Sequence, residues 1–283
     1  MKVLPFKIPK PEQDALVFQK DEGSIFYDQL HQHKEIQMSH IISGSGTLIV
    51  GDTIHQFRDG DVFVIGSDVP HVLKSDAIPK KRSKMLTLFF TEDSFGSDFF
   101  KLEELSELTT VFDRSSQGFK IDSERNNMAR LFLQLETASK LERFIILLQL
   151  LKFASKSSYQ SLSSFVNTKK FRADEGRRLR RIFEYTMKHF TSPISLETIS
   201  NEAAMTKSAF CKYFKKRTNK TYVSFLNELR VEHACKQLIK KRDMAIGEIA
   251  YQSGFSNVSH FNRQFKSIKG QTPKEYRMDN ERL

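Results

Sequence analysis

The sequence has few cysteines and no long apolar run, and each absence excludes a class of protein. Its 283 residues include only two cysteines, Cys211 and Cys235, which excludes a disulfide framework and a zinc knuckle built from CxxC motifs. The longest apolar candidate, residues 144–151, is far shorter than the ~20 residues that span a bilayer. Residues 1–19 contain prolines and lysines without the apolar segment of a secretory signal. We therefore expect a cytoplasmic protein that does not associate with membranes.

Acidic residues are scarce in only one part of the chain. Residues 169–283 contain 25 Lys and Arg against 12 Asp and Glu, whereas residues 1–168 contain 20 against 22. A basic excess confined to one domain is typical of a protein that binds a polyanion, because each neutralised phosphate releases a condensed counterion. The length suits two domains, and the charge predicts that the second binds nucleic acid. The alternative is a basic surface that only keeps the protein soluble.

Residues 24–90 have the pattern of short β-strands. Their apolar residues form brief runs, in places alternating with polar ones, and turn-forming pairs such as Gly51 with Asp52 and Asp59 with Gly60 separate the runs. Strands at such regular spacing predict a compact all-β barrel or sandwich.

Beyond Thr91 the apolar residues recur every three or four positions, which predicts helices over residues 97–108 and 123–154. The apolar stripe of the second segment is wider than one core needs, which indicates either a dimer interface or an internal helix. A serine-rich stretch follows and is interpreted as a linker. The predicted domains are residues 1–155 and 173–283, joined by a linker over residues 156–172.

Two short segments of the second domain share a helix-turn-helix pattern. In residues 195–216, Ser195 caps a short helix, and Thr206 caps a second helix after a tight turn. The apolar positions of the first helix recur 50 residues later and those of the second recur 51 residues later, in residues 246–267. The extra residue lies in the second turn, where Gly254 can take a positive φ. A repeat of this detail favours two helix-turn-helix units over an ordinary helical bundle.

A single helix is predicted between the two units, over residues 222–238, and holds them at a fixed separation. A basic helix after a tight turn is the arrangement that enters a major groove. Two such helices on one chain can read groove segments about 34 Å apart.

The residues from 176 to 277 resemble the AraC-type transcription regulators. The most specific part is residues 246–266, and Lys269 to Arg277 continue the likeness. The resemblance implies two DNA-reading units, and it assigns base-facing positions in both. These positions are Ser208, Ala209, Cys211 and Lys212 in the first unit, and Val258, Ser259, His260, Asn262 and Arg263 in the second.

Side-chain chemistry supports part of this assignment. Lys212, Asn262 and Arg263 can form hydrogen bonds with base edges, whereas Ala209 and Val258 can only touch a thymine methyl group. Further lysines are placed for phosphates: Lys207, Lys215, Lys216 and Lys266. The small side chains of the first unit predict that it depends more on phosphate contacts.

Two residues of this domain also have an interpretation other than a base contact. Cys211 is interpreted as a small filler, with a redox sensor as the alternative. Arg230, in the connecting helix, is interpreted as a structural salt-bridge residue and not as a DNA contact.

The N-terminal domain resembles the cupins from about His31 to Val72. Its pattern comprises His31, His33, a Gly-rich stretch and His71. In metal-binding cupins the two early histidines, an acid and the late histidine converge on one ion, and imidazoles at i and i+2 share one strand face. Here Gln37 stands at the position of the acid, and Glu35 is a possible substitute. Three interpretations stay open: a metal site from the three histidines, a polar effector pocket that also includes Glu35 and Gln37, or structural histidines.

We therefore expect an α+β protein with a cupin-like effector-sensing β-barrel, trailing helices and an all-α DNA-binding domain. The expected function is that of a sequence-specific transcription regulator. It acts as a homodimer on double-stranded DNA under a small-molecule effector bound in the barrel, without enzymatic activity. The only cofactor considered is a divalent metal in the barrel. The alternatives are a metal-dependent cupin enzyme with a basic helical appendage, and an architectural protein without an effector.

Overall fold

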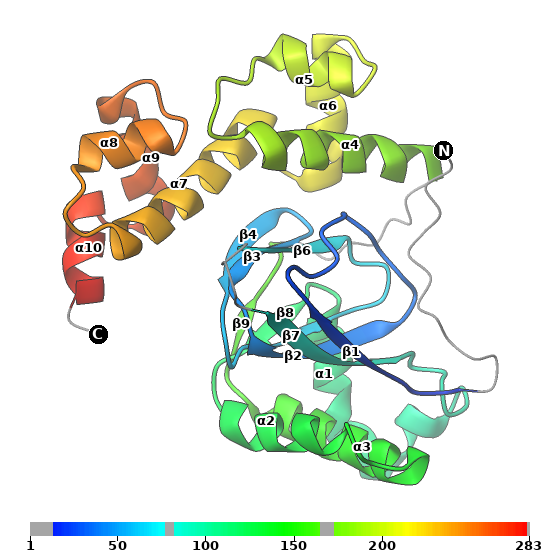
Figure 1. The fold of residues 1–283 in the computed structure, drawn as a ribbon. Helices are drawn as coiled ribbons and strands as arrows, with labels where there is room; N and C mark the ends of the chain where they lie inside the picture. The colour runs from blue at the N-terminus through cyan, green and yellow to red at the C-terminus, as the bar shows by residue number, and fades with distance from the viewer. Residues whose placement is uncertain (1–13, 77–81, 165–172, 282–283) are drawn as a thin grey trace. The chain divides into compact units, whose positions relative to one another are not determined.

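The computed structural model describes residues 14–76, 82–164 and 173–281. By its internal contacts the chain divides into two compact parts, unit 1 over residues 1–174 and unit 2 over residues 175–283 (Figure 1). Unit 1 contains an N-terminal sheet region with helices, and unit 2 is helical where it is described. The strands of unit 1 are β1 Val17–Gly23, β2 Ile36–Ser43, β3 Gly46–Val50, β4 Thr53–Phe57, β5 Val62–Ile65, β6 His71–Ser75, β7 Ser83–Phe90, β8 Phe119–Ile121 and β9 Tyr159–Ser161.

These strands form two antiparallel sheets. The larger has the order β1-β7-β2-β5-β8-β9, and the smaller has the order β4-β3-β6. Because β4 and β6 are the edges of the smaller sheet, no ladder of the described strands continues from it into the larger one. The prediction of a closed barrel is therefore wrong, and the cupin fold is not confirmed.

The central strands β2, β5 and β7 of the larger sheet are buried on both faces. Along β2, Ile36 and Met38 contribute to a core shared with the helices of unit 1, whereas Ile41 contributes to a core shared with the smaller sheet. Successive residues of β5 alternate between the same two cores. This two-sided burial explains the continuous apolar run of β5.

The helical part of unit 1 is more broken than its periodicity predicts. Residues 97–108 form two 3₁₀ turns and not one helix, and a break separates two helices within residues 123–154. At this break Ser139 and Glu142 form a reciprocal capping box that starts a new helix. The elements are η1 Phe99–Lys101, η2 Glu103–Leu108, α1 Thr109–Ser115, α2 Arg125–Gln134 and α3 Lys140–Lys156.

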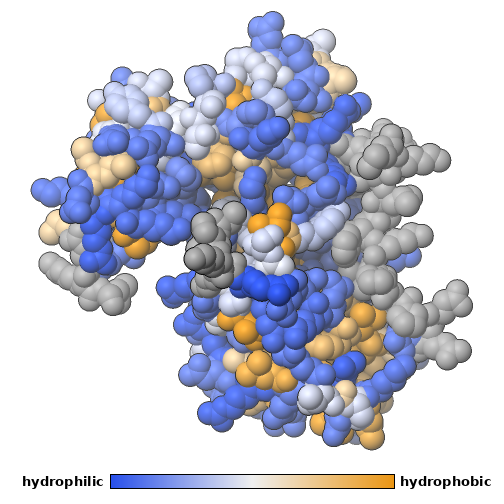
Figure 2. All heavy atoms as spheres, in the orientation of Figure 1, coloured by the Kyte–Doolittle hydropathy of each residue, from blue (hydrophilic) through white to orange (hydrophobic). Residues whose placement is uncertain are grey.

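The wide apolar stripe of α3 is buried on one side and exposed on the other. Ile146, Leu147 and Leu150 are buried in the helix-side core. By contrast, 68% of Leu141 and 47% of Ile145 are exposed. Hydrophobic side chains accordingly reach the surface in the region of α2 and α3 (Figure 2).

The segment expected to be a linker begins inside unit 1. Its β9 strand extends the larger sheet. Beyond it, the Asp52 carboxylate accepts hydrogen bonds from the Ser163 hydroxyl and the Ser164 amide, both at 3.0 Å. The remaining residues of the expected linker, 165–172, lie outside the described ranges.

Unit 2 consists of helices whose lengths repeat. The first short helix and the first long helix have 7 and 12 residues, and their counterparts 50 and 51 residues later have the same lengths. The predicted repeat is thus confirmed. The elements are α4 Ala173–His189, α5 Leu196–Glu202, α6 Lys207–Thr218, α7 Tyr222–Lys240, α8 Ile246–Gln252, α9 Val258–Lys269 and α10 Pro273–Glu281. None of the helices in the described ranges combines the length and apolar character that crossing a lipid bilayer requires.

Candidate nucleic-acid interface and histidine cluster

Side-chain caps begin three of the four helices of the two helix-turn-helix units, namely α5, α6 and α9. The Ser195 hydroxyl accepts a hydrogen bond from the Thr198 amide at 3.0 Å, as the sequence predicts for the start of α5. Thr206 caps α6 by accepting from the Ala209 amide at 3.3 Å. In the second unit, the Asn257 side chain caps α9. Each cap satisfies a backbone amide that the first helical turn leaves without a partner.

The two turns use the same backbone conformation with different residues. Ala204 has a φ of 51° and Gly254 has a φ of 90°. Alanine in this left-handed region costs about 1–2 kcal/mol, whereas glycine tolerates it. The prediction that Gly254 takes a positive φ is confirmed, and the first unit adopts the equivalent turn without a glycine.

A pair of buried phenylalanines anchors each long helix. Phe210 and Phe214 of α6, and Phe261 and Phe265 of α9, are all 0% exposed. In the first unit the ring centroid of Phe214 lies 5.7 Å from that of Phe225 on α7. These anchors fix which face of each long helix points away from the core.

The residues assigned to DNA contact all lie outside the core. None of the thirteen side chains is buried, and most are exposed. The charge of Lys207 is partly neutralised within the first helix-turn-helix unit, because its Nζ lies 2.9 Å from a carboxylate oxygen of Glu197 on α5. The exposed members are Lys207, Ser208, Cys211, Lys212, Lys215, Lys216, Ser259, Asn262, Arg263 and Lys266, and the half-buried members are Ala209, Val258 and His260.

Arg230 is structural, but its partners are carbonyl groups. Its Nε donates to the Phe190 carbonyl at 2.7 Å, and its Nη2 donates to the Ser192 carbonyl at 2.9 Å. These partners are backbone oxygens and not the carboxylate of the predicted salt bridge. The sequence signal for this role was its position in the connecting helix between two buried residues, Leu229 and Val231.

The two cysteines have different surroundings. Cys211 is exposed on α6, whereas Cys235 is buried on α7. Burial raises the pKa of the Cys235 thiol to about 12. Cys235 is therefore a neutral core thiol at physiological pH.

In unit 1, the three predicted histidines come together. Among the described residues, the ligand nitrogens of His31, His33 and His71 lie within 4.8 Å of one another. His31 and His71 pair through both backbone amides, at 3.1 and 2.9 Å. The two early histidines precede β2, so they do not share the face of a regular strand as expected. Glu35 also precedes the strand, and its carboxylate lies 3.8 Å from Nδ1 of His33.

Backbone carbonyls fix the tautomers of the cluster. Nδ1 of each histidine lies 2.8 Å from a carbonyl oxygen two residues away. Because a carbonyl can only accept, each Nδ1 carries a hydrogen and the Nε2 of a neutral ring keeps its lone pair. Gln37 Oε1 lies 3.2 Å from Nε2 of His33 and 3.0 Å from Nε2 of His71. Several acceptors thus converge on one point, a conflict that either a rotated Gln37 amide or a bound cation resolves.

Burial keeps histidines of unit 1 neutral. It lowers the pKa of His71 well below the usual range, helped by repulsion from the charged forms of His31 and His33. Burial also lowers the pKa of His33 and of His40. The unfolded chain therefore binds more protons than the folded chain at acidic pH.

Unit 1 is consequently expected to lose stability as the pH falls below about 6.5, the usual histidine pKa. With a chelator present, each histidine that stays neutral should remove about 1 kcal/mol from the free energy of unfolding between pH 7 and pH 5.5. Urea unfolding followed by circular dichroism at a series of pH values measures this loss. Replacing His71 or His40 by glutamine should reduce the slope, and an unchanged slope in both variants would contradict the assignment.

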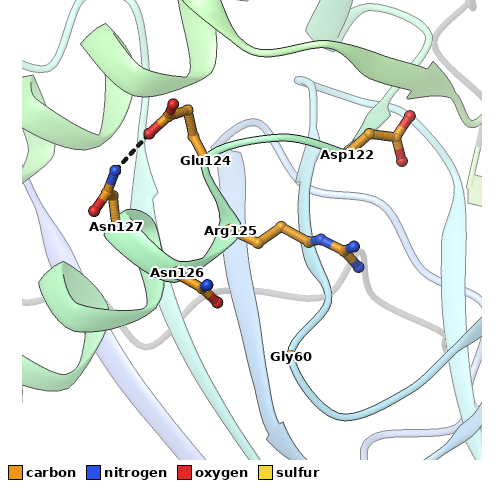
Figure 3. Close-up of a pocket in the computed structure, with 6 residues that line it drawn as sticks. All are labelled: Gly60, Asp122, Glu124, Arg125, Asn126 and Asn127. Carbon is orange, nitrogen blue, oxygen red and sulfur yellow. Dashed lines mark hydrogen bonds between the residues drawn. The ribbon is translucent and has the colours of Figure 1, made fainter.

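A polar depression of about 480 Å³ lies elsewhere in unit 1 (Figure 3). Residues at the start of α2, including Arg125, line it together with Gly60 and Asp122. Glu124 has a φ of 59° there, and its side chain caps no backbone amide of the helix. None of the lining residues belongs to the histidine cluster.

Comparison with known proteins identifies the repeated part of unit 2. Residues 199–279 match the model of a helix-turn-helix domain family. An uncharacterized HTH-type transcriptional regulator of Staphylococcus aureus strain MRSA252 is 27% identical over 276 residues, which is 95% of this chain and 34% of that protein. The YdeC HTH-type regulator of Bacillus subtilis strain 168 is 27% identical over 103 residues, 36% of this chain and 35% of that protein. The chain thus spans about a third of the length of these relatives.

Solved structures with partial likeness were also found. A Listeria innocua protein of unknown function is 30% identical over 35% of this chain and 94% of its own, with a TM-score of 0.34. ToxT from Vibrio cholerae O395 is 17% identical over 93% of this chain and 97% of its own, with a TM-score of 0.37.

Proposed function

We propose that this chain, which carries an AraC-type helix-turn-helix domain over residues 199–279, is a cytoplasmic, sequence-specific DNA-binding transcription regulator. The observation that carries the proposal is the repeat in unit 2. Two 12-residue helices are anchored by buried phenylalanine pairs and expose polar and basic side chains. The relatives are named HTH-type transcriptional regulators, which supports a regulator and disfavours the cupin enzyme.

The geometry of unit 2 suits two adjacent major-groove segments. The connecting helix α7 has 19 residues, which corresponds to a length of about 28 Å. This is close to the ~34 Å that separates successive major grooves on one face of DNA. We infer that α6 and α9 each enter a groove, with Asn262 and Arg263 reading bases and the lysines of α6 mainly contacting phosphates.

The test is a selection of DNA by the full-length protein from a random duplex library. Enrichment of one sequence with two separated conserved segments supports the proposal. The affinity for that sequence should fall steeply with salt, because phosphate contacts release counterions. Equal retention of all sequences, or binding that ignores salt, would overturn the proposal.

We further propose that unit 1 senses an effector at the histidine cluster and that a divalent transition metal fits the cluster best. Three imidazole nitrogens converge with the oxygen of Gln37, and backbone carbonyls already orient the rings. This outer shell is the usual support of histidine metal ligands. His31, His33 and His71 would hold the ion, with Gln37 as a weaker oxygen ligand. An organic effector is the alternative.

Metal addition is therefore expected to stabilise the protein. Zn²⁺, Ni²⁺ or Mn²⁺ added to chelator-treated protein should raise the Tm, because an ion that binds only the folded state stabilises it by mass action. The His71→Gln variant should lose this response, whereas His40→Gln, a buried histidine outside the cluster, should keep it. If the metal is the effector, loading should change the DNA affinity about fivefold or more. An equal Tm response in both variants would contradict the site.

The exposed face of α3 supports a homodimer. Leu141 and Ile145 are large apolar residues at helical spacing with 68% and 47% exposure, and such a face pairs readily with its own copy. Leu141→Lys should weaken self-association about tenfold or more in sedimentation velocity without DNA. The control is Tyr251→Lys, which changes a similarly exposed residue of unit 2. A monomeric wild-type protein at micromolar concentration would rule out this interface.

A further inference from the structure

We infer that Arg230 is a positioning residue that fastens the two helix-turn-helix units into one rigid body, so that the protein accepts its two DNA segments at only one spacing. The inference rests on the DNA-binding function proposed above and adds a rule for the operator. Its evidence is a junction at the middle of α7, made by Arg230, Gly254 and the Phe190–Ser192 segment.

The first unit reaches the junction through the chain that leaves α4. Residues 190–192 connect α4 to α5 and so lead directly into the first helix-turn-helix unit. Two of their carbonyls, those of Phe190 and Ser192, accept from Nε and Nη2 of Arg230 at 2.7 and 2.9 Å. A planar guanidinium with two fixed acceptors sets orientation as well as distance.

The second helix-turn-helix unit reaches the same point through the turn between α8 and α9. A Cβ at Gly254 would lie 2.5 Å from the Phe190 carbonyl oxygen and 2.8 Å from Nε of Arg230. Phe255, the next residue, is buried in the core of the second unit, and its ring centroid lies 5.9 Å from the guanidinium carbon. Backbone of the first unit thus packs directly against the turn of the second.

A second contact in the junction lies one helical turn further along α7. The ring of His233 meets that of Phe190 with centroids 5.3 Å apart. Its Nδ1 lies 3.1 Å from the hydroxyl of the buried Ser253, which precedes Gly254 in the turn. Arg230 and His233 therefore both contact the two units at once.

Without this junction, α7 alone would connect two separate cores. Phe225 packs with the phenylalanines of the first unit. Val231, Ala234 and Leu238 pack in the core of the second. Arg230 lies where one core ends and the other begins. Each unit could otherwise adjust about the helix axis independently, whereas the junction fixes the angle between α6 and α9.

A rigid pair of reading helices restricts the DNA it can bind. Each added base pair moves one segment by about 3.4 Å and rotates it by about a tenth of a turn, because half-sites repeat every 10–10.5 base pairs. A rigid protein can follow such a change only by bending or twisting the DNA, which costs free energy. Two loosely joined reading helices would instead move relative to each other and so follow the new spacing without deforming the DNA.

The test uses full-length protein and duplexes derived from the selected sequence. Two base pairs are inserted or deleted between the two conserved segments, and affinities are measured by fluorescence anisotropy. For the wild type, we expect each change to weaken binding at least tenfold. For Arg230→Ala, we expect weaker binding at the native spacing but less than a threefold loss when the spacing changes.

Two further variants separate the junction from charge and from folding. Arg242→Ala removes an exposed cation from the loop after α7 and should lower affinity equally at every spacing. His233→Ala should flatten the spacing profile if Arg230→Ala does not fold, as judged by circular dichroism. A wild type that tolerates all spacings, or folded junction variants as strict as the wild type, would overturn the inference. Absence of sequence-selective binding by the wild type would instead refute the proposed function.

Discussion

Replacing Gly254 by alanine is expected to lower the free energy of unfolding of the protein by about 3 kcal/mol. Two effects add. Alanine at a φ of 90° carries the cost of the left-handed region. Its Cβ would also lie 2.5 Å from a backbone oxygen, that of Phe190, which cannot rotate away as a flexible side chain would. Urea unfolding of the full-length chain, followed by circular dichroism at a helix-sensitive wavelength, measures the loss.

The first helix-turn-helix unit provides the matched control for this change. Ala204 occupies the equivalent turn with a φ of 51° and is exposed. Ala204→Gly relieves the backbone cost but increases the conformational entropy of the unfolded chain, so the net gain in stability should be only about 0.5 kcal/mol. A loss at Gly254 and a gain at Ala204 would show that both turns favour glycine, and the larger size of the Gly254 effect would show its tighter packing. A Gly254→Ala loss below 1 kcal/mol would contradict the close contact with Phe190.

The features of unit 2 that could be predicted from the sequence, its helix caps and turns, are determined by residues close together in the chain. Helix caps and turns are set by a few neighbouring residues, so Ser195, Thr206 and Gly254 could be interpreted without knowledge of the rest of the chain. The repeat added a second, independent copy of each signal. Phe210 and Phe261, which are recurring apolar positions of the two copies, are accordingly both buried.

Features that depend on distant contacts were predicted less well. The sheets of unit 1 were expected to close into a barrel, but strand alternation does not encode which edges pair. Arg230 was correctly kept apart from the DNA contacts, yet its carbonyl partners lie about 40 residues away. Asp52 was recognised only as a turn residue, whereas it binds serines more than 100 positions further along.

The histidine cluster shows a mixed outcome for the same reason. The resemblance to the cupins implied that His31, His33 and His71 lie together, and in the structure their ring nitrogens do. A regular strand was expected to bring the first two together. In the structure, both residues lie in the loop before β2, and a backbone bridge pairs His31 with His71. Gln37 lies against the rings as its position implied.

Arg263→Ala is expected to weaken binding to the selected DNA by about 1–3 kcal/mol and to relax the sequence preference at one base pair. Arg263 is exposed on α9 and Asn262 precedes it, so both offer hydrogen-bond donors on the face away from the buried phenylalanines. Loss of a bidentate base contact removes discrimination at that base, whereas contacts elsewhere are kept. Affinities for the selected duplex and its single-base variants measure both effects.

Lys215→Ala in the first helix-turn-helix unit is the matched comparison, because Lys215 is also exposed but the other exposed residues of α6 are small or basic. Its loss should weaken binding to all sequences alike and reduce the slope of log affinity against log salt by about 0.9, the value for one phosphate contact. The pattern follows from the unequal chemistry of the two long helices: donors for base edges on α9, and mainly point charges on α6. If Arg263→Ala changed only the salt slope while Lys215→Ala changed the preferred sequence, the roles of the two units would be reversed.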